Sequence, residues 1–267
     1  MSADGGVGVV TPPHEGLQVG GLQVRYRGGL ALRSVGFDVA PGARMAVVGR
    51  NGAGKTSLVL CIAGLLRADA GTVCWAGRNI TRWSPARRVR AGISLVPEGR
   101  QIFPDLTVAE NLRVGGFVAG REMATRRARA YDLFPALAER AAEAASQLSG
   151  GEAQMLAIAQ ALMASPSLIM LDEPSFGLAP VVIARLLEII RDLSKQGIGV
   201  LLVEQSVRLA LLLGGDLYVL DRGQLTLAAL TGAEVDPKVL QAAYLGTRRP
   251  RTSGHAEGRS STPSGSP

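Results

Sequence analysis

Apolar and polar positions follow two different periods along this chain, which predicts a mixed α/β fold. Short apolar or alternating segments predict strands at 17–26, 32–39, 44–48, 72–75, 93–96, 168–171, 200–203 and 217–220. Helical spacing predicts helices at about 54–66 and at 181–195, and a mainly helical region from about 105 to 164. This order of elements predicts an antiparallel β layer, a mixed or parallel core sheet, and a helical subdomain.

The composition divides the chain into one folded domain and two tails. Residues 1–16 are rich in Gly and Pro, and residues 247–267 are rich in Arg, Ser, Pro and Gly, so both ends are predicted to be disordered. The stretch 17–246 is predicted to form one domain whose helical subdomain covers about 100–160. Hydrophobic residues make up 47% of the 267 residues, which is enough to fill a core of that size.

The net charge of +7 comes mostly from arginine, because lysine occurs only at Lys55, Lys195 and Lys238. The arginines are spread over 82–90, 121–129 and 248–251, and no aromatic residues interleave them in a base-stacking pattern. This pattern favours solvated surfaces, with a patch facing anionic phospholipid as the alternative, and it argues against nucleic acid.

The remaining composition argues against several classes of protein. No run of 18 apolar residues predicts a membrane-spanning helix, and the N-terminus does not resemble a signal peptide, so we expect a cytosolic protein, free or docked to a partner. Cys61 and Cys74 lack a metal-type spacing and are predicted to be packed thiols. His14 and His255 fall in the predicted tails, which argues against a metal centre or a His-based triad.

The first chemical motif is a glycine-rich loop between a predicted strand and a predicted helix. It fits the pattern G-x4-G-K-[ST] with the residues Gly49, Arg50, Asn51, Gly52, Ala53, Gly54, Lys55 and Thr56, followed by Ser57. Glycines let backbone N–H groups and the helix N-terminus surround a phosphate. Lys55 would place a charge on the terminal phosphates, and the Thr56 hydroxyl suits Mg2+. An ordinary glycine turn requires neither residue, so the motif predicts a nucleotide site.

The second motif is an apolar strand that ends in two carboxylates, Asp172 and Glu173. The carboxyl ends of strands are where α/β sheets bind ligands. We expect Asp172 to hold Mg2+ through its water shell and Glu173 to polarise the water that attacks the γ-phosphate. An acidic turn without chemistry is the alternative, and the Lys55 loop in the same chain argues against it.

The third motif is LSGGEAQ at 148–154. Ser149 is a predicted N-cap, and Glu152 lies three residues later, where a capping box requires it. A cap alone does not require Gly150 and Gly151, which leave the N–H groups at the start of the helix open to an anion. We therefore predict that this segment both caps a helix and binds an anion.

In this order, the three motifs resemble the nucleotide-binding subunit of ATP-binding cassette (ABC) transporters over about 17–246. The resemblance implies a P-loop NTPase fold of the ABC ATPase type that binds ATP and Mg2+ and hydrolyses ATP. In that family two subunits face head to tail, and each ATP lies between the phosphate loop of one subunit and the LSGGE helix of the other. Ser149, Gly150, Gly151 and Glu152 would then contact the γ-phosphate held by the partner.

The resemblance also assigns roles outside the motifs. Tyr26 matches the aromatic residue that stacks on adenine, although it could simply pack on the sheet. Glu98 replaces a glutamine that touches Mg2+ and faces the membrane partner, unless it is only a surface loop residue. Gln205 replaces a histidine that senses the γ-phosphate, and an amide cannot become cationic. These roles imply a catalytic set of Glu173, Lys55 and Gln205 and a metal set of Thr56, Asp172 and Glu98.

Three segments resemble one branch of the family, the shorter ATP-binding subunits of branched-chain amino acid importers. They are VPEGRQIF at 96–103, LDEPSFGLAP at 171–180 and LLVEQS at 201–206. The resemblance implies a second ATPase subunit in a heterodimer or homodimer, two transmembrane permeases and, indirectly, an extracytoplasmic solute-binding protein. The chain would be peripheral at the cytoplasmic face of the inner membrane.

Three other interpretations remain open at this point. An importer of urea, short-chain amides or another hydrophobic solute would need the same subunit. A soluble ABC ATPase acting on nucleic acid or ribosomes is disfavoured because the chain has one cassette and no heptad run. A small-molecule kinase would leave the LSGGE segment unexplained.

Overall fold

Two β-sheets form the framework of the part of the chain that the structure, a computed structural model, describes: residues 15–26 and 29–229. The antiparallel sheet has the order β2-β1-β4-β5, with the strands β1 (Leu17–Tyr26), β2 (Gly29–Val39), β4 (Ala70–Trp75) and β5 (Arg78–Asn79). The core sheet has the order β10-β9-β3-β8-β7-β6, with the strands β3 (Arg44–Val48), β6 (Ile93–Val96), β7 (Leu168–Asp172), β8 (Gly199–Glu204), β9 (Asp216–Asp221) and β10 (Gln224–Ala229). Only β10 runs antiparallel to its neighbour there. The predicted fold class is confirmed.

Strand β7 shows why an apolar run was needed at the centre of the core sheet. Successive side chains of a strand point to opposite faces. Leu168 and Met170 join the hydrophobic cluster toward helix α1 (Lys55–Ala63), while Ile169 and Leu171 join the cluster under the helices on the other face. A strand covered on both faces has no solvated side for polar residues.

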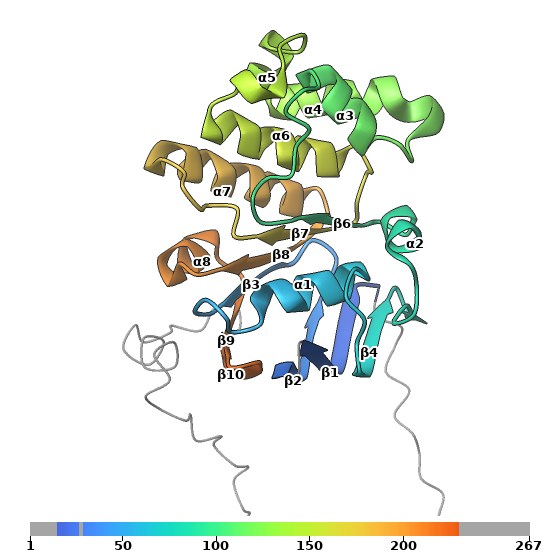
Figure 1. The fold of residues 1–267 in the computed structure, drawn as a ribbon, viewed down its shortest axis with the longest axis vertical. Coiled ribbons are helices and arrows are strands. Elements are labelled where there is room, and N and C mark those ends of the chain that lie inside the picture. The colour runs from blue at the N-terminus through green and yellow to red at the C-terminus, as the bar shows by residue number, and fades with distance from the viewer. Residues whose placement is uncertain (1–14, 27–28, 230–267) are drawn as a thin grey trace, which may run out of the picture.

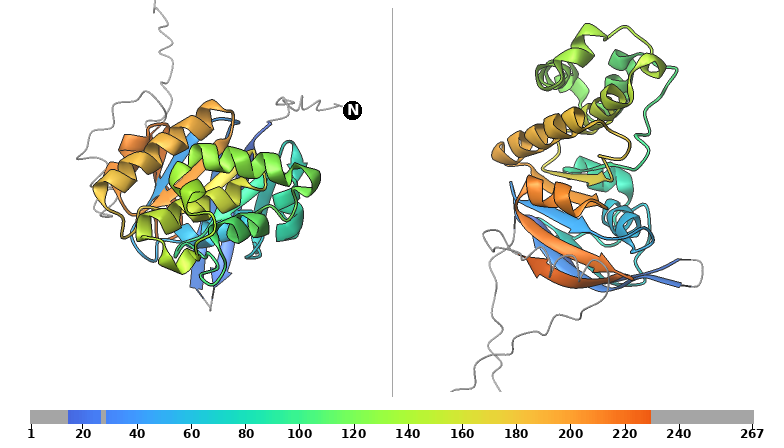
Figure 2. Two further views of the ribbon diagram at one scale, coloured as in Figure 1. Left: turned by 90° about the horizontal axis from the view of Figure 1, so that it is seen from above. Right: turned by 90° about the vertical axis from the view of Figure 1, so that its left-hand side faces the viewer.

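Helices cover both faces of the core sheet, and a further group of helices lies on one side (Figure 1). Helix α1 lies between the two sheets, and α7 (Pro180–Lys195) covers the opposite face of the core sheet. The helical layer lies beyond α7 (Figure 2) and contains α3 (Val108–Gly115), η1 (Gly120–Glu122), α4 (Met123–Leu133), α5 (Pro135–Glu139), η2 (Ala145–Gln147) and α6 (Gly150–Leu162). Short helices α2 (Pro85–Arg90) and α8 (Val207–Leu213) complete the fold.

Among the 82–90 arginines, which were predicted to be solvated, Arg82, Arg87 and Arg90 are exposed but Arg88 of helix α2 is buried. Arg88 has only 2% of its surface exposed, and its guanidinium donates hydrogen bonds to five backbone carbonyls. Two of these carbonyls belong to Cys61 and Ile62, in the last turn of α1, where carbonyls lack the regular i to i+4 partners of a helix. Arg88 therefore connects α2 to the end of the helix that carries Lys55.

Cys61 is buried and Cys74 is half-buried, and both are free thiols.

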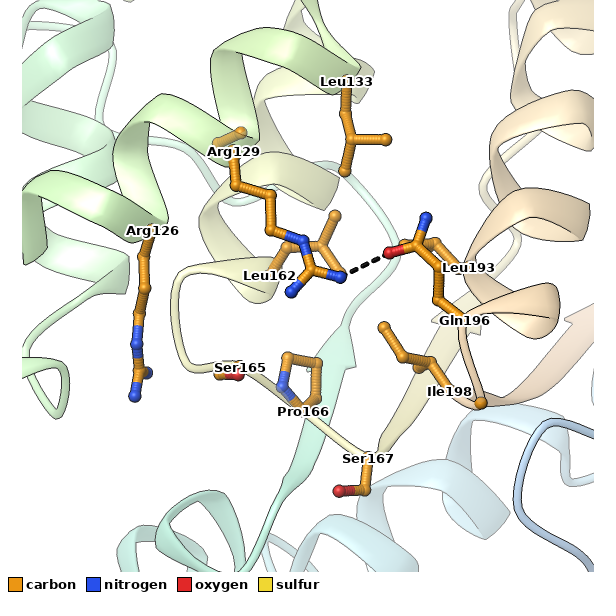
Figure 3. A pocket seen from close by; sticks show the side chains of 12 residues that line it. Arg126, Arg129, Leu133, Leu162, Ser165, Pro166, Ser167, Leu193, Gln196 and Ile198 are labelled. Carbon is orange, nitrogen blue, oxygen red and sulfur yellow. Dashed lines mark hydrogen bonds between the residues drawn. The ribbon is translucent and has the colours of Figure 1, made fainter. Parts of the chain in front are cut away.

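Polar contacts join the helical layer to the core sheet around a cavity of about 240 Å3 (Figure 3). Arg129 of α4 donates to the side-chain oxygen of Gln196, just after α7. Arg126 donates to the carbonyl of Met163 at 3.0 Å. The contact of Arg129 crosses from the helical layer to α7, and the contact of Arg126 holds α4 against the end of α6 within the helical layer.

The predicted disordered ends fall mostly outside the described residues, which begin at 15 and stop at 229. The bounds 17–246 for the domain and about 100–160 for its helical subdomain stay predictions. In the described segments, no helix is both long enough and apolar enough to cross a membrane.

Candidate nucleotide-binding site

The carboxyl ends of four neighbouring parallel strands meet at one edge of the core sheet. Strands β3, β8, β7 and β6 lie side by side in that order. Their registers align the strand ends, because β3 pairs in parallel with β8, β8 with β7, and β7 with β6. This edge therefore carries, from the four strands, the phosphate loop at 49–54, Gln205, Asp172 with Glu173, and Glu98.

Lys55 is held inside the phosphate loop, with only 4% of its surface exposed. Its Nζ donates to the carbonyl of Gly49 at 2.8 Å and to the carbonyl of Arg50 at 3.3 Å. The same Nζ forms an ion pair with Oε1 of Glu173 at 3.0 Å. A phosphate entering the loop would compete with these oxygens for the lysine, because charge-assisted hydrogen bonds to phosphate are strong.

Two glycines of the loop are required by close approaches of the backbone. A Cβ atom on Gly49 would lie 2.4 Å from the carbonyl oxygen of Leu220. Gly54, just before α1, has a φ of 110°, and a Cβ there would lie 2.4 Å from the carbonyl oxygen of Ala31. Only glycine therefore fits at these two positions of the loop. Without side chains there, the N–H groups at the start of α1 stay uncovered.

Glu173 follows β7 in an unusual backbone conformation. Its φ is +46°, in the left-handed region that non-glycine residues rarely adopt. Its N–H donates to the carbonyl of Val203 at 2.9 Å, so β8 holds the turn in place. The strained turn aims the carboxylate at Lys55 rather than along the strand.

Asp172 has the properties of a cation ligand. Its side chain is 2% exposed, and Oδ1 has no hydrogen-bond partner among the described residues. Burial raises the pKa of Asp172 from 3.8 to about 6, while a hydrogen bond from Thr56 lowers it and the charges of Glu173 and Glu98 raise it. An added positive charge would favour the ionised form.

The donor set at Asp172 fits Mg2+ bound together with a nucleotide. Thr56 offers a hydroxyl oxygen, Asp172 a carboxylate, and Glu98 a second carboxylate close enough to act on Asp172. The described residues contain no group of three or more Asp, Glu, His or Cys able to hold a metal by themselves. Mg2+ typically takes one or two carboxylates plus phosphate oxygens, so this set suits it.

The LSGGE segment begins α6 with the predicted capping box. Ser149 Oγ accepts a hydrogen bond from the N–H of Glu152 at 3.3 Å, and Glu152 Oε2 accepts one from the N–H of Ser149 at 2.8 Å. Arg140 also donates to Oε2 of Glu152 at 2.8 Å. A Cβ on Gly151 would lie 3.0 Å from the side chain of Val182, so packing also favours glycine there.

The chain does not bring its own LSGGE segment to its own phosphate loop. No hydrogen bond or ion pair among the described residues joins Ser149–Glu152 to the loop. Helix α6 belongs to the helical layer, whereas α1 lies between the sheets (Figure 1). The loop that holds Lys55 and the LSGGE segment are therefore separate features of one chain.

Glu204 is a residue of the site that sequence reasoning missed. It is 2% exposed at the end of β8, where Oε1 accepts from the N–H of Ser175 and Oε2 from the N–H of Gln205, both at 3.1 Å. Burial raises its pKa in spite of these bonds. Glu204 thus fixes both the loop after β7 and the backbone of Gln205. An acidic residue closing an apolar strand, as at Asp172, was the available signal.

For the other predicted site residues, the structure gives little beyond the exposure of the side chain. Glu98, Gln205, Arg50, Asn51, Gly52 and Thr56 are exposed, Ser57 is half-buried and Ala53 is buried. Tyr26 closes β1, where its backbone pairs with Gly29, but its side chain lies outside what the structure describes. The proposed stacking of Tyr26 on adenine stays a prediction.

Comparison with known proteins agrees with this geometry. The family model described as "ABC transporter" matches residues 32–176. The branched-chain amino acid transport ATP-binding protein BraG of Pseudomonas aeruginosa is 42% identical over 81% of this chain and 93% of its own length. The probable branched-chain amino acid transport ATP-binding protein LivF of Archaeoglobus fulgidus is 36% identical over 76% of this chain and 87% of its own length.

A solved structure supports the same conclusion. The ADP conformation of an ATP-binding cassette of an ABC transporter superposes with a TM-score of 0.76 at 28% identity, covering 86% of this chain and 98% of that one. Fold and site together define a P-loop ATPase of the cassette type. The chain belongs to the ABC transporter family, as one of its ATPases.

Proposed function

We propose that this chain binds and hydrolyses ATP to energise an ABC importer for branched-chain amino acids. The observation that carries the proposal is the cluster at the sheet edge, where buried Lys55 contacts Glu173 beside the unpaired Oδ1 of Asp172. The separate LSGGE cap on α6 adds a second phosphate-binding segment. A kinase would have no use for that second segment.

The phosphate loop would hold the ATP phosphates with its backbone N–H groups and Lys55. Thr56, Asp172 and Glu98 would hold Mg2+, which when bound offsets the negative charge of the phosphates. Tyr26 would stack on adenine. Phosphate binding to Lys55 releases Glu173 from its ion pair, so the carboxylate becomes free to orient the attacking water. Gln205, fixed by Glu204, would donate a hydrogen bond to the γ-phosphate.

The site is completed by a second ATPase subunit. Ser149 to Glu152 would bind the γ-phosphate of ATP held by the partner's loop, since they do not reach the loop of their own chain. ATP then favours a closed dimer, because it contacts both subunits only in that state. The partner is a different subunit or a second copy, and two permeases convert closure into transport at the cytoplasmic face of the membrane, with an extracytoplasmic binding protein delivering the solute.

The solute is proposed from the relatives alone. Two relatives named as branched-chain amino acid transport proteins match most of this chain. In proteoliposomes containing the assembled transporter, ATP should drive uptake of leucine, isoleucine or valine. Uptake of urea with no uptake of these amino acids would overturn the solute assignment while leaving the ATPase intact.

The catalytic roles are tested by two substitutions. Glu173→Gln should lower ATP turnover of the assembled transporter by at least about a hundredfold while ATP binding is retained, because the carboxylate that orients the water is lost. Lys55→Ala should weaken ATP binding by about tenfold or more. Glu188→Gln and Lys195→Ala change exposed groups on α7 and should leave both values unchanged. Normal turnover in Glu173→Gln would exclude its role.

A further inference from the structure

Arg100 lies where the loop after β6 meets the first turn of α6. A Cβ atom placed on Gly150 would be 3.2 Å from both Nη1 and Nη2 of Arg100, so the guanidinium covers this glycine. Glu98, two residues earlier, lies close enough to Asp172 to raise its pKa. The loop 98–100 therefore places the carboxylate of Glu98 near Asp172 and the guanidinium of Arg100 at the LSGGE segment.

The backbone that places Arg100 is strained and firmly held. Gly99, Arg100 and Gln101 have φ values of 80°, 69° and 42°, so three consecutive residues are left-handed and two of them carry side chains. The buried side chain of Asn111 fixes the next turn, because its Oδ1 accepts from the N–H of Phe103 and its Nδ2 donates to the carbonyl of Phe103. Such strain persists only where neighbouring structure determines it.

The charge of Arg100 is not compensated within the described chain. Arg100 makes no hydrogen bond or ion pair there, and it lies at the positive end of the α6 dipole, where a cation is unfavourable. Glu152, in the same first turn, is already bonded to Ser149 and Arg140. A guanidinium and a helix N-terminus that face the same space both attract one anion.

We propose that Arg100 binds the γ-phosphate of the ATP held by the partner subunit's phosphate loop, together with the N–H groups that begin α6. This inference rests on the proposed function of the LSGGE segment. The loop 98–100 would then touch both ATP sites of the dimer, through Glu98 at the site of this chain and through Arg100 at the site of the partner. Arg100 also lines a cavity of about 420 Å3 with Phe103 and Val114, so a carboxylate of a permease is the competing ligand.

The test asks on which subunit the substitution acts. The complete transporter is trapped with vanadate, which takes the place of the γ-phosphate, and 8-azido-ADP formed from 8-azido-ATP is photocrosslinked to the subunit whose phosphate loop holds it. Different ATPase subunits separate on a gel, and for a homodimer two differently tagged copies are combined, with the substitution in one. Arg100→Ala should lower the label on the opposite subunit by about tenfold and spare the label on its own subunit.

Three further variants make the outcome decisive. Arg100→Lys keeps the charge and should restore most of the label, and Arg78→Ala, on distant β5, should have no effect. ADP affinity should be unchanged in Arg100→Ala. Gly151→Asp places a carboxylate at the anion and should abolish the label on the opposite subunit.

The possible contrary results separate the two proposals. Loss of label in Gly151→Asp but not in Arg100→Ala overturns the role of Arg100 and keeps the composite site. No loss in either variant overturns both. Equal loss on both subunits, or loss of transport coupling with normal trapping, assigns Arg100 to a permease contact and overturns its role at the phosphate.

Discussion

Asp172, Glu173 and Glu204 are three acidic residues at the same sheet edge, but the groups around each carboxylate differ. Asp172 is buried with one unpaired oxygen, and its pKa is raised to about 6. Glu173 is neutralised by Lys55 at 3.0 Å. Glu204 is buried against two backbone N–H groups and serves as a structural clamp. We therefore propose that Asp172 serves as a metal ligand and Glu173 orients the attacking water, whereas Glu204 holds two backbone segments together, and that these roles follow from the groups in contact with each carboxylate.

Glu204→Gln tests the clamp. Glutamine can accept from only one of the two N–H groups, so the free energy of unfolding should fall by about 1–3 kcal/mol. Because burial raises the pKa of Glu204, the wild type gains stability as its carboxyl protonates, and this gain disappears as the pH rises through that pKa. The destabilisation by Glu204→Gln should therefore be larger at low pH than at pH 8. Urea unfolding at several pH values measures it, and a difference that grows with pH would contradict the raised pKa.

At the scale of elements, eight of the ten described strands were predicted from the sequence, whereas β5, β10 and the long-range polar contacts were not. The strand ends at Val48 and Val96 follow from apolar runs and fall at the predicted residues. Helix α6 began where Ser149 and Glu152 predicted a capping box. Helices α2 and α8 were missed because each is at most seven residues long, too short to show a period. The partners of Arg88 could not be predicted, since they are backbone carbonyls from separate segments brought together only by folding.

Arg88→Ala tests how α2 supports the phosphate loop. It would remove a hydrogen bond from five carbonyls, two of them at the end of α1, and three of the five would keep no other backbone donor among the described residues, so the free energy of unfolding should fall by about 3–5 kcal/mol. The exposed Arg90 of the same helix is the control, and Arg90→Ala should change stability by less than about 0.5 kcal/mol. Chemical unfolding followed by circular dichroism compares them. Equal free energies of unfolding for Arg88→Ala and Arg90→Ala would show that water hydrogen-bonds to these carbonyls in place of Arg88.

At the scale of the whole molecule, the two segments proposed to bind phosphate lie in different layers. The loop with Lys55 precedes a helix packed between two sheets, and Ser149 begins a helix of the outer layer (Figure 2). In the proposed dimer, the angle between these layers decides whether the LSGGE segment reaches the partner's ATP. Arg126 and Arg129 line the cavity in Figure 3, where Arg129 donates to Gln196 at the junction of the layers, and Arg126 holds α4 to the end of α6. Their loss should act on closure of the dimer more than on nucleotide binding within one chain.

The double substitution Arg126→Ala with Arg129→Ala tests this junction. Arg129 donates a hydrogen bond across the layers to Gln196, and Arg126 donates one to Met163 at the end of α6. Partly exposed bonds contribute little, so the free energy of unfolding should fall by only about 1 kcal/mol, or ~2–4 °C in Tm. ATP affinity of the single chain should be unchanged, because the phosphate loop lies in the other layer. The kcat for ATP in the assembled transporter should fall by about tenfold, since a loosened layer must be ordered each time the dimer closes. Arg121→Ala, exposed in η1, is the matched control. A lower ATP affinity of the single chain with unchanged kcat would show instead that the junction shapes the chain's own phosphate loop.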